Sequence, residues 1–244
     1  MDIRIEQASL RWQHHCVFSN LNLSLPAGHW TSILGQSGVG KSSLLQLLCG
    51  IADDAEIEGR IECSDGRPLQ GRVAWMAQQD LLLPWLSLLD NVLLGARLRQ
   101  GTPSAEQKEL GHYLLQQVGL ADRALSLPAQ LSGGQRQRVA LARTLFQDQP
   151  LICMDEPFSA LDAITRLRLQ DLAAKLLSGR TVLMITHDPL EALRLSDRIQ
   201  VLRGTPAHLT DPLLPSGTVP RSVDAPEVLE YQGRLLRMLA EDTP

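Results

Sequence analysis

An eight-residue loop constrains the fold of this chain more than any other feature. It fits the pattern G-x-x-x-x-G-K-[ST] without a gap, through Gly35, Gln36, Ser37, Gly38, Val39, Gly40, Lys41 and Ser42. The apolar segment Trp30–Leu34 before it predicts a strand, and Lys41–Cys49 has helical spacing. Backbone N–H groups of such a loop wrap around phosphate oxygens, and the helix N-terminus adds partial positive charge. The loop therefore predicts an α/β fold that binds ATP, with Lys41 on the β- and γ-phosphates and the Ser42 hydroxyl on Mg²⁺.

Two adjacent acids end another predicted buried strand. The apolar segment Leu151–Met154 runs directly into Asp155 and Glu156. Ligands of open α/β sheets lie beyond the carboxyl ends of the strands, so these acids are expected to face the phosphate loop. We expect Asp155 to hold Mg²⁺ through water and Glu156 to act as general base toward the attacking water. His187 follows the predicted strand Thr181–Thr186 at the same edge, where it could contact the γ-phosphate.

A second predicted helix begins with an anion-binding pattern. Ser132 is a natural N-cap, and Gln135 three residues later completes a capping box. Capping alone does not explain Gly133 and Gly134 in the first turn, because glycine lowers helix stability there. Bare glycines leave room for an anion to reach the backbone N–H groups. One explanation is that this helix completes the ATP site of a second copy of the chain, which predicts nucleotide-dependent dimerisation.

The rest of the chain alternates strands with helices. Predicted strands cover Ile3–Ala8, Asn20–Leu25, Glu56–Cys63, Arg72–Met76 and Ile199–Leu202. Predicted helices cover much of 84–120, then Gly134–Gln147, Ala163–Leu177 and Glu227–Leu239, whereas 204–224 reads as a loose connection. This order predicts a mostly parallel sheet covered by helices, with an antiparallel patch formed near the N-terminus.

Composition excludes several other classes of protein. The 244 residues carry a net charge of −4 without a long basic run, so nucleic acid is not an expected partner. The four cysteines lack C-x-x-C spacing and are expected to be free thiols. The N-terminus shows no apolar signal segment, and the longest near-apolar stretch, Leu81–Leu89, is far shorter than the roughly 20 residues of a spanning helix.

The sequence LSGGQRQR at 131–138 resembles the signature motif of ATP-binding cassette (ABC) proteins, and it stands between the two phosphate-site motifs in the family's order. Gln78 resembles the family's Q-loop glutamine, and Asp162 belongs to a segment that resembles the D-loop. His187 resembles the switch histidine. Trp12 lies where the family places an aromatic residue that stacks on adenine, although tyrosine is commoner there. Ser43 stands where threonine is common.

The resemblance implies a P-loop NTPase fold: a RecA-like core with a parallel sheet, an antiparallel β-subdomain and an inserted helical subdomain at about 79–147. It assigns residues 1–205 to the ABC ATPase domain and 206–244 to a linker and helix. Two copies face head to tail around two ATP molecules. Each site then combines the phosphate loop, Ser43, Trp12, Asp162 and the acids of one chain with Ser132–Gln135 of the other. Gln78 serves as a Mg²⁺ ligand and a catalytic residue.

The segment after Gln78 indicates which kind of cassette this is. In the family this region receives the coupling helix of a permease, and Leu82-Leu83-Pro84-Trp85 is similar to importers of the nitrate, sulfonate and taurine group, which also take up thiamine pyrimidine precursors. Residues 205–244 are too short for the regulatory domain of sugar importers. The expected function is an importer subunit on the cytoplasmic face of the inner membrane, bound to permease subunits and served by a periplasmic binding protein. An exporter with a separate permease and a soluble regulatory ATPase are the alternatives.

Overall fold

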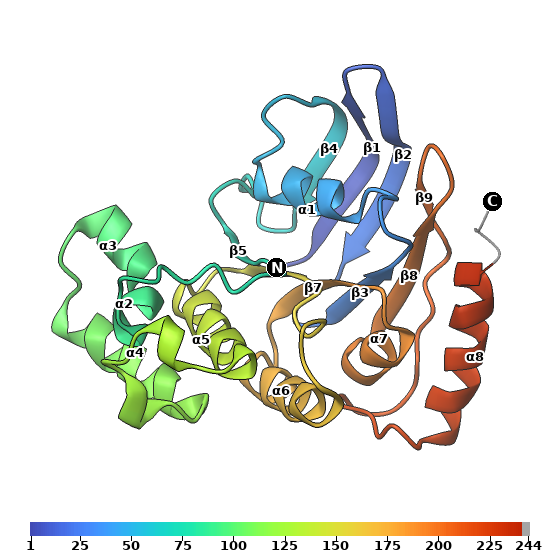
Figure 1. Ribbon diagram of the computed structural model, residues 1–244. Coiled ribbons are helices and arrows are strands. Elements are labelled where there is room, and N and C mark those ends of the chain that lie inside the picture. Colours follow the sequence, from blue (N-terminus) through green and yellow to red (C-terminus); the bar gives the residue numbers. More distant parts are fainter. Residues whose placement is uncertain (241–244) are drawn as a thin grey trace.

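A six-stranded sheet forms the centre of the computed structural model, which describes residues 1–240 (Figure 1). Its strand order is β5-β6-β7-β3-β8-β9, where the first five strands run parallel and β9 pairs antiparallel with β8. The strands are β5 (Val73–Met76), β6 (Leu151–Asp155), β7 (Thr181–Thr186), β3 (Trp30–Leu34), β8 (Arg198–Arg203) and β9 (His208–Leu209). The prediction of a mostly parallel sheet is confirmed.

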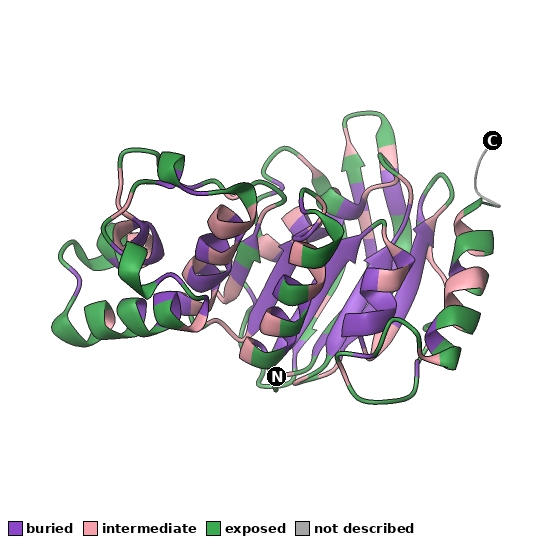
Figure 2. Cartoon of the chain, turned by 60° about the horizontal axis from the view of Figure 1, so that its bottom comes forward, coloured by how far each residue is buried: buried purple, intermediate pink, exposed green. Residues whose placement is uncertain are grey.

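Helices cover this sheet on both faces, as the buried strands in Figure 2 show. They are α1 (Lys41–Cys49), α6 (Ala163–Leu176), α7 (Pro189–Leu195) and α8 (Pro226–Ala240). Alternate residues of β6 belong to two separate cores: Leu151 and Cys153 join one, and Ile152 and Met154 join the other. Burial on both faces is the reason that these strands read as continuous apolar runs.

A second, antiparallel sheet of three strands packs above the central sheet (Figure 1). Its order is β2-β1-β4, from β1 (Ile3–Trp12), β2 (His15–Leu25) and β4 (Glu56–Cys63). One face is buried, because Ile3, Ile5 and Leu10 contribute to the same core as α1. This sheet is the antiparallel patch that the alternating N-terminal sequence predicts, although β1 and β2 extend further toward their shared turn than predicted.

The helices between residues 88 and 146 form a lobe at one side of the molecule (Figure 1). They are α2 (Leu88–Val92), α3 (Leu94–Gln100), α4 (Ala105–Gln117) and α5 (Gly133–Phe146), with 3₁₀ turns at Ala121–Arg123 and Pro128–Gln130. Their apolar residues share a core of their own, which includes Leu88, Val92, Leu115 and Val139. Within residues 1–240, none of the helices has the length and apolar character needed to cross a bilayer.

Two parts of the fold differ from the prediction. Helix α7 was not predicted, since it is only seven residues long and begins with a proline. Residues 204–224 are not a loose connection, because they contain β9 and the buried side chain of Arg221. The expected helix at Glu227–Leu239 is present as α8, one residue longer at each end.

Helix α7 places a carboxyl group in the interior. Glu191 is 3% exposed and accepts a hydrogen bond from Gln170 Nε2 at 3.2 Å. Burial raises its pKa to about 7; Asp188 adds to the rise, whereas a hydrogen bond from Thr186, the bond from Gln170 and the charge of Arg166 oppose it. The protonated form of Glu191 is therefore favoured in the folded protein below about pH 7.

This pKa predicts a pH-dependent term in stability. Because the folded pKa lies above the unfolded value, Glu191 contributes most stability below about pH 4.5, and that contribution is lost as pH rises to about 7. The loss is at most roughly 3 kcal/mol. Glu191→Gln keeps a neutral side chain of the same shape, so urea unfolding at pH 5 and pH 8 should show the variant gaining stability relative to the parent at pH 8. If the difference in unfolding free energy between variant and parent were the same at both pH values, the raised pKa of Glu191 would be contradicted.

Candidate functional site

The phosphate loop lies between β3 and α1, at the carboxyl end of the central sheet. Lys41 Nζ donates to the carbonyl oxygens of Gly35 and Gln36, each at 2.8 Å, so the buried ammonium holds the loop closed on itself. Gly40 has φ +107°, and a Cβ there would lie 2.4 Å from Val17 Cγ1. Glycine is therefore required at this position by both backbone conformation and space.

The acids at the end of β6 lie beside the loop, as predicted. Ser42 Oγ donates to Asp155 Oδ2 at 3.4 Å. Burial, and then the neighbouring Glu156 carboxylate, raise the pKa of Asp155, while Ser42 and Lys41 oppose the rise. Burial also lowers the pKa of Lys41, against the opposing charges of Glu156 and Asp155. The site thus holds two acids and one ammonium in a partly desolvated cluster.

Oxygen ligands at this cluster fit a magnesium ion. Mg²⁺ prefers oxygen donors and keeps several of its waters, so a serine hydroxyl and one carboxylate form a typical protein share of its ligands. Ser42 and Asp155 present these two groups next to each other. A divalent cation there would stabilise the Asp155 carboxylate, whose charged form is disfavoured by burial and by Glu156.

Glu156 is held in place from three directions. Its backbone has φ +45°, a conformation that non-glycine residues rarely adopt and that is concentrated at functional sites. Its N–H donates to the carbonyl oxygen of Ile185 at 2.8 Å, which fixes it against β7. Gln78 Nε2 donates to Glu156 Oε2 at 3.3 Å, and His187 Nδ1 lies 3.1 Å from the same oxygen. Two of the three residues predicted to be catalytic, Gln78 and His187, therefore both contact the third, Glu156, although the three come from separate segments of the chain.

The signature segment lies on the helical lobe. Ser132 caps α5, where its hydroxyl accepts from Gln135 N at 3.3 Å and Gln135 Oε1 accepts from Ser132 N at 2.9 Å. Ser132 and Gly133 are exposed at this helix end. Gly134 has a packing reason to lack a side chain, because a Cβ there would lie 2.8 Å from Thr165 Cγ2 on α6. Anion access therefore remains an argument for Gly133 only, and the role of Ser132–Gln135 in a second copy remains a prediction.

Asp162 and Ser43 lie at the ends of helices next to the site. The Asp162 carboxylate caps α6 by accepting from Thr165 N at 3.0 Å, and this hydrogen bond lowers its pKa. Just before it, Ser159 Oγ donates to the carbonyl oxygen of Glu156 at 3.0 Å. Ser43 is half-buried in the first turn of α1. The contact of Ser159 connects the predicted D-loop to Glu156.

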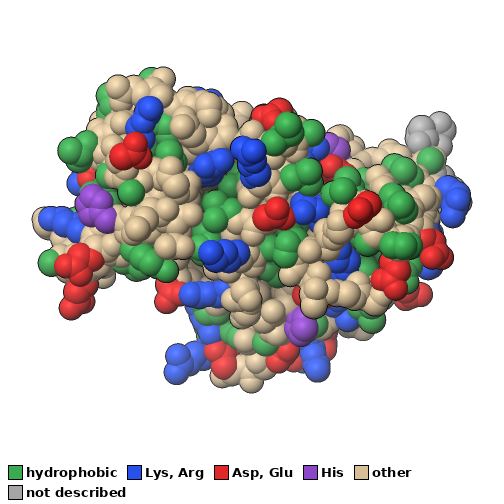
Figure 3. Space-filling model, turned by 90° about the horizontal axis from the view of Figure 1, so that it is seen from below, with side chains coloured by type: hydrophobic (Ala, Val, Ile, Leu, Met, Phe, Trp, Pro, Cys, Tyr) green, Lys and Arg blue, Asp and Glu red, His purple; other side chains and the backbone are tan. Residues whose placement is uncertain are grey.

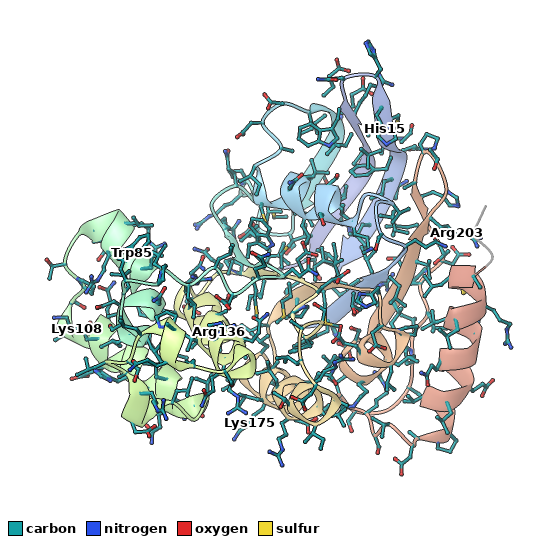
Figure 4. All side chains as sticks on the ribbon, in the orientation of Figure 1. His15, Trp85, Lys108, Arg136, Lys175 and Arg203 are labelled. Carbon is teal, nitrogen blue, oxygen red and sulfur yellow. The ribbon has the colours of Figure 1, made fainter. Side chains whose placement is uncertain are left out.

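A hollow of about 310 Å³ opens beside the phosphate loop. Residues from three segments line it: His15 and Val17 of β2, the loop residues 36–39, and residues 202–205 at the end of β8 and just after it. Figure 4 labels two of these residues, His15 at the start of β2 and Arg203 at the end of β8. Trp12 is half-buried at the end of β1 and packs on the core beneath, and it is not one of the residues that line the hollow. Sequence reasoning missed His15, Val17 and Arg203, because no motif marks them.

Known proteins are similar in sequence to this chain over most of its length. Residues 18–159 match the ABC transporter family. An uncharacterized ABC transporter ATP-binding protein of Haemophilus influenzae is 48% identical over 240 residues, which is 97% of this chain and 98% of that protein. An aliphatic sulfonates import ATP-binding protein of Paracoccus denitrificans is 38% identical over 244 residues, which is 99% of this chain and 95% of that protein.

Solved structures agree with the sequence relatives. A dimeric ATP-binding cassette in a post-hydrolysis state, bound to ADP and Pi, superposes with a TM-score of 0.73 and is 30% identical, covering 88% of this chain and all of that one. An inward-facing transporter of putative metal-chelate type gives the same TM-score at 28% identity and covers 85% of this chain and 82% of that one. Both the predicted P-loop fold and the predicted family are confirmed. The chain therefore belongs to the ABC transporter family, as a cassette subunit that binds and hydrolyses ATP.

Proposed function

We propose that this chain energises an importer for a small solute, by hydrolysing Mg²⁺–ATP in sites shared between two copies. The observation that carries the proposal is the contact of Glu156 Oε2 with Gln78 and His187, directly beside Asp155, Ser42 and Lys41. A phosphate loop alone binds nucleotide, whereas this arrangement also provides a positioned base. The import direction rests on the names of the sulfonate relatives and on the segment that follows Gln78.

Each side chain then has a role in phosphoryl transfer to water. Gln78 and His187 both contact Oε2 of Glu156, and we assign Oε1 to the attacking water, which Glu156 orients and polarises. Nδ1 of His187 lies 3.1 Å from the carboxylate, and we assign its other ring nitrogen, Nε2, to the γ-phosphate. Ser42, Gln78 and Asp155 would hold Mg²⁺, which would supply positive charge at the β- and γ-phosphates.

The other predicted contacts belong to binding and assembly. Lys41 exchanges the carbonyl oxygens of its own loop for phosphate oxygens, and Trp12 and Ser43 complete the nucleotide site. Ser132–Gln135 of a second copy close it, with Asp162 at the junction. The dimeric state of a solved relative supports this arrangement. The two exposed helix-cap residues Ser132 and Gly133 leave a second copy room to approach.

An exposed aromatic residue supports docking on a permease. Trp85 is 71% exposed and lies in the segment that follows Gln78, on the helical lobe (Figure 4). Leu81, 55% exposed, lies in the same segment. Large exposed apolar side chains that lie together mark interaction sites. Because the segment is continuous with Gln78, a permease bound there would act directly on the residue that contacts Glu156. The proposed location is the cytoplasmic face of the membrane that holds this permease.

Isolation of the complex from its native membrane tests the proposal. We expect the tagged chain to copurify with a transmembrane permease, and the associated binding protein to bind a small solute, with aliphatic sulfonates as the first class to measure. Trp85→Ala should reduce permease recovery at least fivefold through loss of a buried aromatic contact. Ile57→Ala, at an exposed apolar residue of β4, serves as the matched control. Failure to recover any permease, or recovery equal in both variants, would contradict the proposed docking.

A further inference from the structure

The C-terminal segment is anchored to the core by one buried arginine. The guanidinium of Arg221 donates to the carbonyl oxygens of Leu193 and Ser196, each at 2.8 Å, at the end of α7. It also donates to the carbonyl oxygens of Pro215 at 2.8 Å and Ser216 at 2.6 Å. Four backbone acceptors therefore satisfy a cation that is 6% exposed. This anchor fixes the point from which α8 begins.

Helix α8 packs against the strand that leads into the phosphate loop. Val228 and Leu235, each 1% exposed, form a core with Leu34, Val201 and residues of α7. Leu34 is the last residue of β3, immediately before the loop. In Figure 1, α8 runs along the side of the molecule next to α7 and β8. Its buried face therefore supports the base of the nucleotide site.

The last turn of α8 reaches the loop itself. Gln36 Nε2 donates to the carbonyl oxygen of Leu239 at 3.0 Å, across 203 positions of sequence. The carbonyl oxygen of Gln36 accepts from Lys41 Nζ at 2.8 Å. Gln36 thus connects the end of α8 to Lys41, the lysine that we expect to bind the phosphates. The carbonyl groups in the last turn of a helix have no partner within their own helix. The side-chain amide of Gln36 therefore supplies the donor that the carbonyl group of Leu239 does not find within α8.

We propose that α8 is a positioning element of the ATP site, coupled to nucleotide binding through Gln36. The side chain of Gln36 holds the loop in the conformation that receives the phosphates, and the rigid, anchored helix supplies the fixed point. ATP binding and the order of the last turn of α8 must then strengthen each other by the same factor, because coupling between two equilibria is reciprocal. This inference rests on the proposed ATP site.

Loss of one hydrogen bond of this kind corresponds to about a fivefold change in affinity. We expect Gln36→Ala to weaken binding of a non-hydrolysable ATP analogue with Mg²⁺ by about fivefold. The free protein should melt only slightly lower, because it too loses the hydrogen bond to Leu239. In the parent protein, the analogue should slow amide exchange in the last turn of α8, up to residue 240, by up to about fivefold. In Gln36→Ala, exchange in this turn should no longer respond to the analogue.

Two further variants separate coupling from general damage. Leu235→Ala, introduced into the parent protein, should loosen α8 and weaken binding of the analogue. Introduced into Gln36→Ala, it should weaken binding little further, because both substitutions act through the contact of Gln36 with Leu239. Leu229→Ala, at a residue 56% exposed on the outer face of α8, should leave binding unchanged. Additive losses of affinity in the double variant would overturn the coupling. So would amide exchange in α8 that stays the same when the analogue binds. Absence of analogue binding to the parent protein would instead contradict the proposed function.

Discussion

Glu156→Gln is expected to bind ATP with near-parental affinity and to lose at least about 100-fold of its turnover, since general base catalysis contributes roughly 10²–10⁴-fold. The amide keeps the shape and the contacts at Gln78 and His187, but it cannot accept a proton from water. ATP should therefore remain bound and hold two copies together. Nucleotide titration and single-turnover hydrolysis measure the two quantities separately.

A matched substitution tests whether the removal of one negative charge is enough to lower turnover. Glu58→Gln removes a carboxylate from an exposed position of β4, and its turnover should equal that of the parent. Hydrolysis in Glu156→Gln within threefold of the parental rate would show that another group activates the water. Equal losses in both variants would point to a general electrostatic effect instead.

Ser132→Arg is expected to abolish hydrolysis while ATP binding to the separate chain stays within twofold of the parental value. Ser132 lies at the exposed end of α5, on a different lobe from the phosphate loop of its own chain (Figure 1). A long cation there would prevent the helix end from closing on ATP held by a second copy. We expect at least a 100-fold loss of turnover, because the site cannot be completed.

Helix α4 offers a control with the same chemistry. Ser104 caps α4 through a capping box with Gln107, just as Ser132 caps α5 with Gln135. Ser104→Arg and Ser132→Arg should each cost about 1 kcal/mol of stability through the lost cap. Only Ser132→Arg should lose turnover. Similar activities of the two variants would mean that Ser132 acts on helix stability and not on a partner's ATP.

Local sequence patterns predicted the parts of the fold that local chemistry determines. The bounds of β3 and α1 follow from an apolar run, the glycine loop and helical spacing, and the structure has them at the same residues. The strand-end acids and His187 could be placed at one edge because parallel strands share their carboxyl ends. Helices α5 and α6 agree with the predicted ranges within one residue at each end, and the Ser132 capping box marks the start of α5 in the sequence.

Contacts between segments that are distant in the sequence could not be predicted from local patterns. Arg221 looked like a residue of a loose linker, yet its four carbonyl partners lie on α7 and on an irregular segment. The contact of Gln36 with Leu239 depends on how α8 docks, and no spacing encodes it. For Gly134, the sequence pattern suggested a role that the structure does not require. The pattern suggested that this glycine makes room for an anion, whereas the closeness of Thr165 explains by packing alone why no side chain fits there.

The face of the molecule drawn in Figure 3 carries charged side chains of both signs. Figure 3 shows acidic and basic side chains interspersed over one face, without a basic stripe. This distribution agrees with the modest net charge of −4.

The mass of Glu156→Gln in solution, measured by sedimentation with and without Mg²⁺–ATP, tests the shared site most directly. The account predicts one chain mass without nucleotide, twice that mass with ATP, and a return to one chain mass when Ser132→Arg is added to the same variant. A dimer that forms without ATP, a mass that never doubles, or a double variant that still dimerises with ATP would contradict it.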